Sequence, residues 1–307
     1  MGAAEEHVTF PGARRPDRRY VVDSSGVGIA VSEWGDPDAP PLLLAHGGFD
    51  FVGTYDVFAP LIAAGGWRVV AWDQRGHGDS EHAALYSWGA DLRDVTAVLD
   101  SLGVIDPLPL VGHSKGAGVL LDLAEAVPHR ASHVVNMDGL PSSRNLPDRI
   151  DERTRMVSSE LAGWLDHRRA SATKRRRAGT LDELAERRRR MNPRLSMAWL
   201  RYLVTVGGRK DEDGWRWKID PRLRMNGFGP WRPEWSLIRL PGLRMPFFGI
   251  LAAQPEVMGW GTQMEDLEPW LPDGAEMETW EDSGHFVHIE FPERAAERVL
   301  DFLARHP

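Results

Sequence analysis

The stretch "LVGHSKGAGVLLDLA", Leu110 to Ala124, places Ser114 between two glycines where an apolar run changes into a helical pattern. The residues before the serine, "LPLV", are typical of a buried strand, and "AGVLLDLA" after it has apolar residues at helical spacing. A sharp strand-to-helix turn strains its middle residue and lifts that side chain off the end of the sheet. The free N–H groups at the start of the helix then favour negative charge beside the hydroxyl. The motif Gly112-x-Ser114-x-Gly116 therefore predicts a nucleophilic serine.

The segments around this motif alternate between strand and helix patterns. "RYVVDSSGVGIAVSEWG" predicts two strands joined by a turn, and "PPLLLAHGG" and "WRVVAWD" are short apolar runs typical of strands buried on both faces. "YDVFAPLIAAGG" and "WGADLRDVTAVLDSLG" have helical apolar spacing and end at glycine. This alternation predicts a mostly parallel sheet with right-handed crossovers.

Length and composition set limits on the class of protein. The chain has 307 residues, of which 42% are hydrophobic and 27% are charged, as in a globular protein built around one core with an insertion. It has no cysteine, which excludes disulfides, a thiolate nucleophile and Cys-ligated metals. We find neither a secretory signal pattern nor an apolar run of about 18 residues, so we expect a cytoplasmic protein with no membrane span.

Charge is unevenly distributed along the chain. Residues 144–224 carry 22 Lys and Arg against 12 Asp and Glu, whereas the remainder carries 15 against 33. The runs "KRRR" (174–177) and "RRRR" (187–190) raise the question of nucleic-acid binding. Acidic residues share the same helical stretch and the whole chain has a net charge of −8, so we expect no nucleic-acid partner. A solvated helix face, or a latch onto the acidic body, is the favoured interpretation.

Three further motifs accompany the serine. They are "HGG" (His46 to Gly48), "DQRGHGDS" (Asp73 to Ser80) and "DSGHFVHIEFPE" (Asp282 to Glu293). Together with the serine turn, and in this order, they resemble the α/β-hydrolase family over about residues 19–140 and 240–307.

This resemblance implies a mostly parallel, eight-stranded sheet flanked by helices, with a helical lid inserted after the sixth strand. We expect a hydrolase core formed by residues 1–140 and 236–307 and a lid formed by residues 141–235. Within the lid, "DEDGWRWKIDPRLR" (211–224) is similar to a lid ending of serine-hydrolase-like members.

A serine hydroxyl needs a base within hydrogen-bond reach. His285 lies in a loop between the strand-like "AEMETWE" and the final helix, so we predict that it is the general base. His288 is the alternative, although packing beside the base suits its apolar surroundings better. Structural roles in the neighbouring loops are expected for three other histidines: His46, His77 and His113.

The acid that orients the histidine has two candidates. The resemblance favours Glu256, which follows the strand after the lid, over Asp138, which ends the strand "VVNMDG". The resemblance also implies an oxyanion hole made of backbone N–H groups from Lys115 and Gly48, with Phe49 as the second choice in the HGG loop. We expect the Lys115 side chain to reach solvent or to pair with an acid on a neighbouring element rather than to bind substrate.

These residues predict a serine hydrolase that cleaves a carboxylic ester or lactone through an acyl-enzyme on Ser114. A serine argues against epoxide-opening and halide-removing members, which use an aspartate nucleophile. Carbon–carbon bond hydrolases, thioesterases and perhydrolases retain a serine and stay open as alternatives. A non-catalytic binding protein on the same scaffold is a further alternative of a different class.

The expected partner is a medium-sized, fairly hydrophobic ester-like small molecule, since ligand pockets are mostly apolar. Candidate pocket walls are Phe49, Trp88, Trp164 and Trp199. The positive charge of the lid could steer an anionic substrate. The sequence has no H-E-x-x-H pattern, phosphate loop or dinucleotide fingerprint, so we expect no metal and no cofactor.

Overall fold

The computed structural model describes residues 8–142, 152–223 and 235–307. Its centre is an eight-stranded sheet with the order β1-β2-β4-β3-β5-β6-β9-β10. The strands are β1 (Arg18–Asp23), β2 (Gly28–Trp34), β3 (Pro41–Ala45), β4 (Arg68–Trp72), β5 (Leu108–His113), β6 (Ala131–Met137), β9 (Phe247–Ala252) and β10 (Glu276–Trp280). Only β2 pairs antiparallel with its two neighbours, β1 and β4, and every other pairing is parallel. The predicted eight-stranded, mostly parallel sheet is confirmed.

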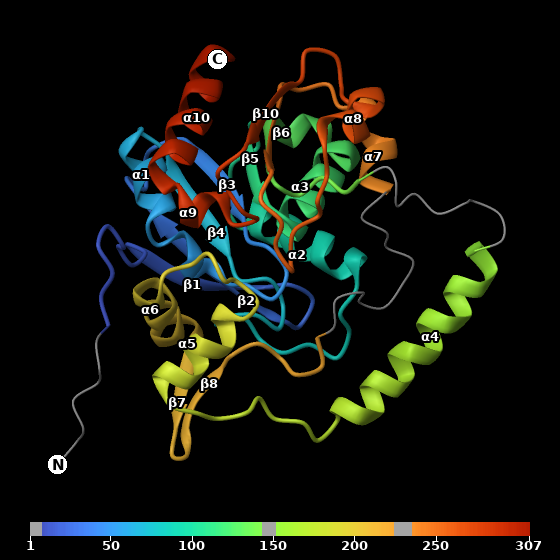
Figure 1. The fold of residues 1–307 in the computed structure, drawn as a ribbon. Coiled ribbons are helices and arrows are strands. Elements are labelled where there is room, and N and C mark those ends of the chain that lie inside the picture. Colours follow the sequence, from blue (N-terminus) through green and yellow to red (C-terminus); the bar gives the residue numbers. More distant parts are fainter. Residues whose placement is uncertain (1–7, 143–151, 224–234) are drawn as a thin grey trace.

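Helices cover both faces of this sheet (Figure 1). On one face, α1 (Phe58–Ala64) and α10 (Pro292–Arg305) bury apolar side chains such as Ile62 and Phe302. On the other face lie α2 (Trp88–Ser101), α3 (Lys115–Ala126) and α7 (Trp235–Arg239). The remaining helices of the body are short: η1 (Val52–Tyr55), η2 (Pro128–Arg130), η4 (Leu240–Gly242), α8 (Met264–Leu267), η5 (Glu268–Trp270) and α9 (Val287–Glu290). The sheet is therefore buried on both faces, which explains why its central strands are continuous apolar runs.

Between β6 and α7 the chain leaves the sheet. It forms α4 (Glu152–Ser171), α5 (Leu181–Arg189), α6 (Met197–Gly207) and a hairpin of β7 (Gly208–Asp211) and β8 (Gly214–Trp217). We call residues 152–223 the middle segment. Helices α5 and α6 bury an apolar cluster against the body, including Phe51 and Phe286, whereas α4 projects away from it (Figure 1). The middle segment follows the sixth strand, as the sequence predicted, and its action as a lid stays a prediction.

The strands from β3 to β10 that run parallel all end at one edge of the sheet. The register between β6 and β9, the strands on either side of the middle segment in the sequence, pairs Val134 with Phe247. Both residues lie outside the middle segment. The sequence motifs follow the carboxyl ends of β3, β4, β5 and β10, so this edge gathers all four of them. Across the three described ranges, no helix is both long and apolar enough to cross a lipid bilayer.

Candidate active site

Ser114 lies at the sharp turn between β5 and α3. Its backbone has φ 51° and ψ −124°, a conformation that a residue with a side chain rarely adopts. Its N–H donates to the carbonyl of Met137 at 3.1 Å, which fixes the turn to the end of β6. The serine thus stands at the carboxyl edge of the sheet, at the N-terminus of α3, as the sequence predicted.

The glycines on both sides of Ser114 are required by space. A Cβ atom on Gly112 would lie 2.5 Å from Cα of Ala117, and one on Gly116 would collide with the carbonyl oxygens at the end of β3. Real Cβ atoms do not come this close to backbone atoms, so only glycine lets α3 pack against the sheet here. The G-x-S-x-G spacing is thereby explained by packing.

His285 follows β10 and contacts a carboxylate through its ring. Nδ1 lies 2.6 Å from Oδ2 of Asp138, and both side chains are buried, with 2% and 7% exposure. The other carboxylate oxygen of Asp138 accepts a hydrogen bond from the N–H of Ala252 at 3.0 Å. The backbone N–H of Asp138 donates to the carbonyl of Ile250 at 2.8 Å. The carboxylate is therefore held between β6 and β9 and faces the histidine ring.

Glu256 takes a different place from the one that the sequence favoured. Its Oε2 accepts the backbone N–H of His285 at 2.9 Å, so it contacts the histidine's main chain and not the ring. Burial, together with the nearby Glu290, raises the pKa of the Glu256 carboxyl. Asp138 reaches the ring because it directly follows β6, the strand next to the serine's own β5, whereas Glu256 lies beyond β9. The ring's carboxylate partner is thus Asp138 rather than Glu256.

The serine and histidine loops are joined by the residue before the serine. Nε2 of His113 donates to the carbonyl of His285 at 2.8 Å, and the two imidazole rings lie with centroids 4.7 Å apart. In the described structure Ser114 Oγ forms no hydrogen bond with the His285 ring. Such bonds are often long without substrate and tighten in the complex.

Of the three backbone N–H groups predicted for the oxyanion hole, two have no acceptor among the described residues. The N–H of Phe49, a residue with φ 59°, already donates to Nε2 of His77 at 3.2 Å. The N–H of Gly48 forms no hydrogen bond with any described residue. That of Lys115 belongs to the first residue of α3, so it has no acceptor within the helix. Gly48 and Lys115 therefore remain as backbone donors beside the serine.

The Lys115 side chain links helix α2 to the loop after β4. Its ammonium lies 2.7 Å from Oδ2 of Asp91 on α2 and donates to Oε1 of Gln74 at 2.8 Å. Gln74 in turn donates its backbone N–H to Nε2 of His46 at 2.9 Å. Burial raises the pKa of Asp91, and the Lys115 charge opposes this shift. The expected pairing of Lys115 with an acid on a neighbouring element is confirmed.

Four other histidines near the site are fully buried. Burial lowers the pKa of His46 and His288 to about 3 and lowers the pKa of His77 and His113 well below the ordinary value. The His288 ring packs 4.7 Å from Tyr55 and 4.5 Å from His113, and neither of its nitrogens has a hydrogen-bond partner within the described residues. These rings are neutral at physiological pH. The packing expected of His288 agrees with this position.

The predicted pocket walls lie in different surroundings. Phe49 lies at the site, with its ring centroid 6.4 Å from that of His77. Trp199 is buried in the α5–α6 cluster and stacks on Tyr202 at 5.2 Å. Trp88 hydrogen-bonds with Asp122, and Trp164 on α4 lies under the Arg168 guanidinium. The role of these four residues in substrate binding stays a prediction.

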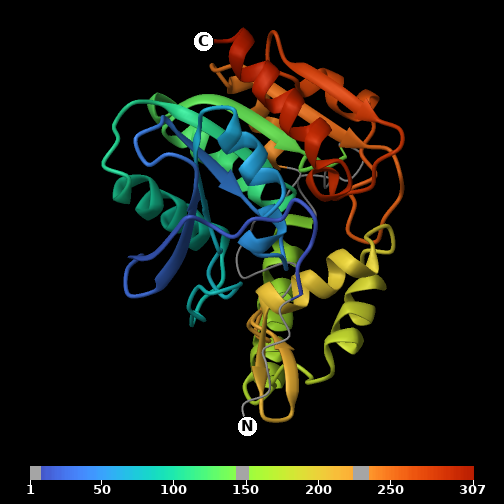
Figure 2. The ribbon, with the colours of Figure 1, turned by 90° about the vertical axis from the view of Figure 1, so that its left-hand side faces the viewer.

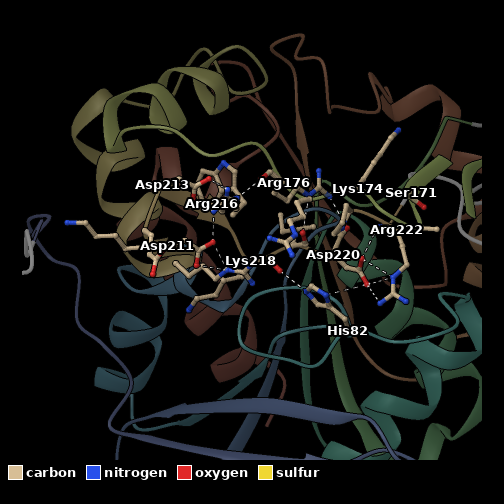
Figure 3. Close-up of a pocket in the computed structure, with 18 of the residues that line it drawn as sticks. His82, Ser171, Lys174, Arg176, Asp211, Asp213, Arg216, Lys218, Asp220 and Arg222 are labelled. Carbon is tan, nitrogen blue, oxygen red and sulfur yellow. Dashed lines mark hydrogen bonds and ion pairs between the residues drawn. The ribbon is translucent and has the colours of Figure 1, made fainter. Parts of the chain in front are cut away.

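A cavity of about 1230 Å³ is lined by the middle segment together with His82 (Figure 3). Neither Ser114 nor His285 is among its lining residues. Basic side chains predominate around it, and several are neutralised locally. Arg216 pairs with Asp211 at 2.6 Å, and Arg222 pairs with Asp220 at 2.8 Å. Within the described ranges, no group of three or more His, Asp or Glu side chains is arranged to hold a metal ion.

Sequence reasoning missed two arginines of the middle segment that reach the site. Arg188 donates to the carbonyl of Phe49 at 3.1 Å, and Arg194 pairs with Glu290 at 2.7 Å. The "RRRR" run suggested a solvated face, yet Arg188 continues the buried face of α5 that begins with Leu181. The helical spacing was the signal that could have revealed this burial. One face of α5 carries Leu181, Leu184, Ala185 and Arg188.

The fold and this arrangement define the class of protein. The family described as the alpha/beta hydrolase fold matches residues 40–292, so the chain belongs to the α/β-hydrolase family. It is 26% identical over 275 residues to the sn-1-specific diacylglycerol lipase ABHD11 of Mus musculus, covering 88% of this chain and 83% of that protein.

Two other similarities were found. A match to a serine hydrolase-like protein of Dictyostelium discoideum is 32% identical over 117 residues, or 37% of this chain, and spans only 33% of that protein. Among solved structures, a thioesterase domain from the curacin biosynthetic pathway superposes with a TM-score of 0.79 and 24% identity, covering 92% of this chain and 99% of that domain. This last similarity concerns the fold.

Proposed function

We propose that this chain is a serine hydrolase that cleaves a carboxylic ester or lactone through an acyl-enzyme on Ser114. The observation that carries the proposal is the contact of the His285 ring with a buried carboxylate at the sheet edge where Ser114 stands. The serine stands in a strained turn, and the His285 ring is hydrogen-bonded to Asp138 at 2.6 Å. A serine, an imidazole and a carboxylate at such a place form the elements of an acyl-transfer site.

In the proposed mechanism, Ser114 Oγ attacks the acyl carbon while Nε2 of His285 takes its proton. The Asp138 carboxylate accepts a hydrogen bond from the Nδ1–H of the ring, which fixes the tautomer and stabilises the imidazolium. The N–H groups of Gly48 and Lys115 donate to the developing oxyanion. His285 then protonates the leaving alcohol, and a water molecule activated by the same ring hydrolyses the acyl-enzyme.

Glu256 has a supporting role in this proposal. By accepting the N–H of His285, it fixes the main chain that carries the base. The substrate class rests on similarity and on composition. The resemblance to a diacylglycerol lipase and the aromatic side chain of Phe49 in the loop after β3 favour an ester with an apolar acyl group.

The test is turnover of p-nitrophenyl esters of increasing acyl length, with a thioester of equal length assayed in parallel. Wild-type protein should hydrolyse the esters and react with a serine-directed fluorophosphonate, and Ser114→Ala should do neither. Preference for the thioester would replace the ester assignment with a thioesterase. Absence of both turnover and labelling in correctly folded wild-type protein would favour a binding protein on this scaffold.

A further inference from the structure

Two arginines that flank the turn after α5 reach from the middle segment to two different loops of the site. Arg188 donates to the carbonyl of Phe49 at 3.1 Å and to Oδ1 of Asp50 at 3.2 Å. Arg194 donates to Oε2 of Glu290 at 2.7 Å and to the carbonyl of Asp282 at 2.6 Å. In Figure 2 the yellow turn that follows α5 lies against the orange-red loops near the C-terminus.

The Arg188 contact is buried. The side chains of Arg188 and Asp50 are only 13% and 1% exposed, and the guanidinium lies 5.8 Å from the centre of the Phe286 ring. By contrast, Arg189 pairs with Glu186 where both side chains are about half exposed, at 50% and 43%. An exposed pair contributes little, whereas removing one partner of a buried pair leaves an uncompensated charge.

Arg188 acts on the loop that carries a proposed oxyanion donor. The N–H of Phe49 donates to His77, and its carbonyl accepts from Arg188, so both peptide groups of this residue are held. Phe49 has φ 59°, an unfavourable conformation that persists only where its surroundings impose it. The peptide that joins Gly48 to Phe49 is thus fixed by the body, and the next peptide, which joins Phe49 to Asp50, is fixed by the middle segment.

Arg194 acts on the loop that carries the histidine. Its partner Glu290 accepts the N–H of Gly284 at 3.1 Å, and Gly284 directly precedes His285. The other guanidinium contact holds the carbonyl of Asp282 three residues before the histidine. Arg194 therefore holds two backbone groups upstream of the proposed base: the carbonyl of Asp282 directly, and the N–H of Gly284 through Glu290.

We propose that Arg188 and Arg194 are positioning residues through which docking of the α5–α6 turn aligns the oxyanion loop and the histidine loop. The expected effect on catalysis rests on the proposed function. The expected effect on the order of the two loops rests on the contacts alone. A displacement of about 1 Å in a reacting or donating group costs up to about 100-fold in rate. The middle segment in this view completes the site.

The catalytic test compares Arg188→Gln and Arg194→Gln with Arg189→Gln as the matched control. Arg188→Gln should lower kcat by about 10- to 100-fold with KM changed less than about threefold, because alignment in the transition state is lost. It should weaken binding of an alkylboronic acid, a tetrahedral mimic, by a similar factor. Arg188→Lys should lose less than Arg188→Gln, and Arg189→Gln should match wild type.

Asp50→Asn provides a double-mutant cycle. If Asp50 acts through Arg188, the double variant should lose no more kcat than the worse single variant. Additive losses would contradict a shared role for this pair.

Hydrogen exchange separates this proposal from the proposed function. Arg188→Gln should speed exchange in residues 46–51 while leaving residues 283–286 unchanged, and Arg194→Gln should do the reverse. If wild-type protein shows no turnover that depends on Ser114, the proposed function fails and the exchange pattern still decides the positioning role. Exchange and thermal stability indistinguishable from Arg189→Gln would overturn the proposal, and so would unchanged kcat in an active enzyme.

Discussion

The carboxyl edge of the sheet and the middle segment are held in place by different means. At the sheet edge, Phe49, Ser114 and Asp138 all have positive φ, whereas no described non-glycine residue of the middle segment does. The middle segment instead has many ion pairs, such as that of Arg201 with Asp182 at 2.6 Å. The edge is specified by backbone geometry that few residue types tolerate, whereas the middle segment combines the apolar cluster of α5 and α6 with charges that salt weakens. Large functional effects are therefore expected at the edge, and small ones across most of the middle segment.

Removing the nucleophile should have the largest effect. Ser114→Ala should lower kcat for a p-nitrophenyl ester by about a million-fold, because only binding and oxyanion stabilisation remain. Steady-state kinetics and fluorophosphonate labelling would measure the loss, with thermal unfolding as the check that the variant folds. Retention of most of the activity would show that the reaction occurs elsewhere.

The two acids at the edge should differ strongly. Asp138→Asn should lower kcat by about 10,000-fold, since a neutral amide does not stabilise the imidazolium and its NH2 group would donate to Nδ1, which favours the wrong tautomer. Glu256→Gln should cost less than about tenfold, because its contact is with the main chain of His285. A comparison of kcat for the two variants at the same pH measures the difference. Equal losses, large or small, would contradict the assignment of Asp138 to the ring.

Acidification should destabilise the body through its buried histidines. The folded-state pKa of His46 and His288 is lowered to about 3, below that of an unfolded histidine near 6.5, so the unfolded chain binds more protons between these values. Stability is complete above about pH 6.5 and falls as pH decreases towards 3, by about 2 kcal/mol per ring between pH 7 and pH 5. Urea unfolding at a series of pH values measures this loss.

His288→Phe is the matched variant for that experiment. Its replacement removes a titrating ring whose nitrogens have no partner in the described structure while keeping an aromatic ring beside Tyr55. The pH dependence should become shallower by the contribution of one ring. An unchanged dependence would mean that His288 is not neutral and buried in the native state.

Relaxing the strained turn should stabilise the fold at the expense of function. Ser114→Gly should increase the free energy of unfolding by about 1 kcal/mol relative to Ser114→Ala, because glycine adopts φ 51° without strain. Ser114 makes no side-chain cap to α3, so no hydrogen bond of that kind is lost. Denaturant unfolding of the two inactive variants gives the difference. Equal stability would indicate that the turn stores no strain.

The smallest effect concerns the charge of the middle segment. If its excess of basic side chains steers substrate, kcat/KM for an ester with an anionic acyl group should fall by about two- to fivefold between 50 and 500 mM salt. A neutral ester of the same size is the control and should show no such dependence. A flat profile for the anionic ester would remove the steering hypothesis.

Local patterns predicted the elements of the edge well. A glycine spacing between an apolar strand and an apolar helix is a local signal, so Ser114 and its turn could be found without tertiary information. The histidine loop was likewise recognisable because Gly284 and His285 precede the final helix. The paired acid was harder to predict, since Asp138 and Glu256 both follow parallel strands and only the sheet order decides which reaches the ring.

Contacts of the middle segment depended on information that the sequence pattern carried only weakly. Four consecutive arginines suggest a solvated face, and the burial of Arg188 becomes evident only when α5 packs against Phe51 and Phe286. Its neighbour Arg189 remains on the exposed side with Glu186. Adjacent arginines therefore have different environments because successive residues point to different sides of the helix.

The register of β6 against β9 has a practical consequence for engineering. The pairing of Val134 with Phe247 does not involve residues 152–223. Replacing these residues with the corresponding segment of a homologue should therefore leave the sheet assembled. Chimaeras of this kind would fold yet turn over slowly unless the graft supplied cations that meet Asp50 and Glu290. Libraries designed to broaden the range of accepted esters should therefore randomise the graft while keeping those two guanidinium groups constant.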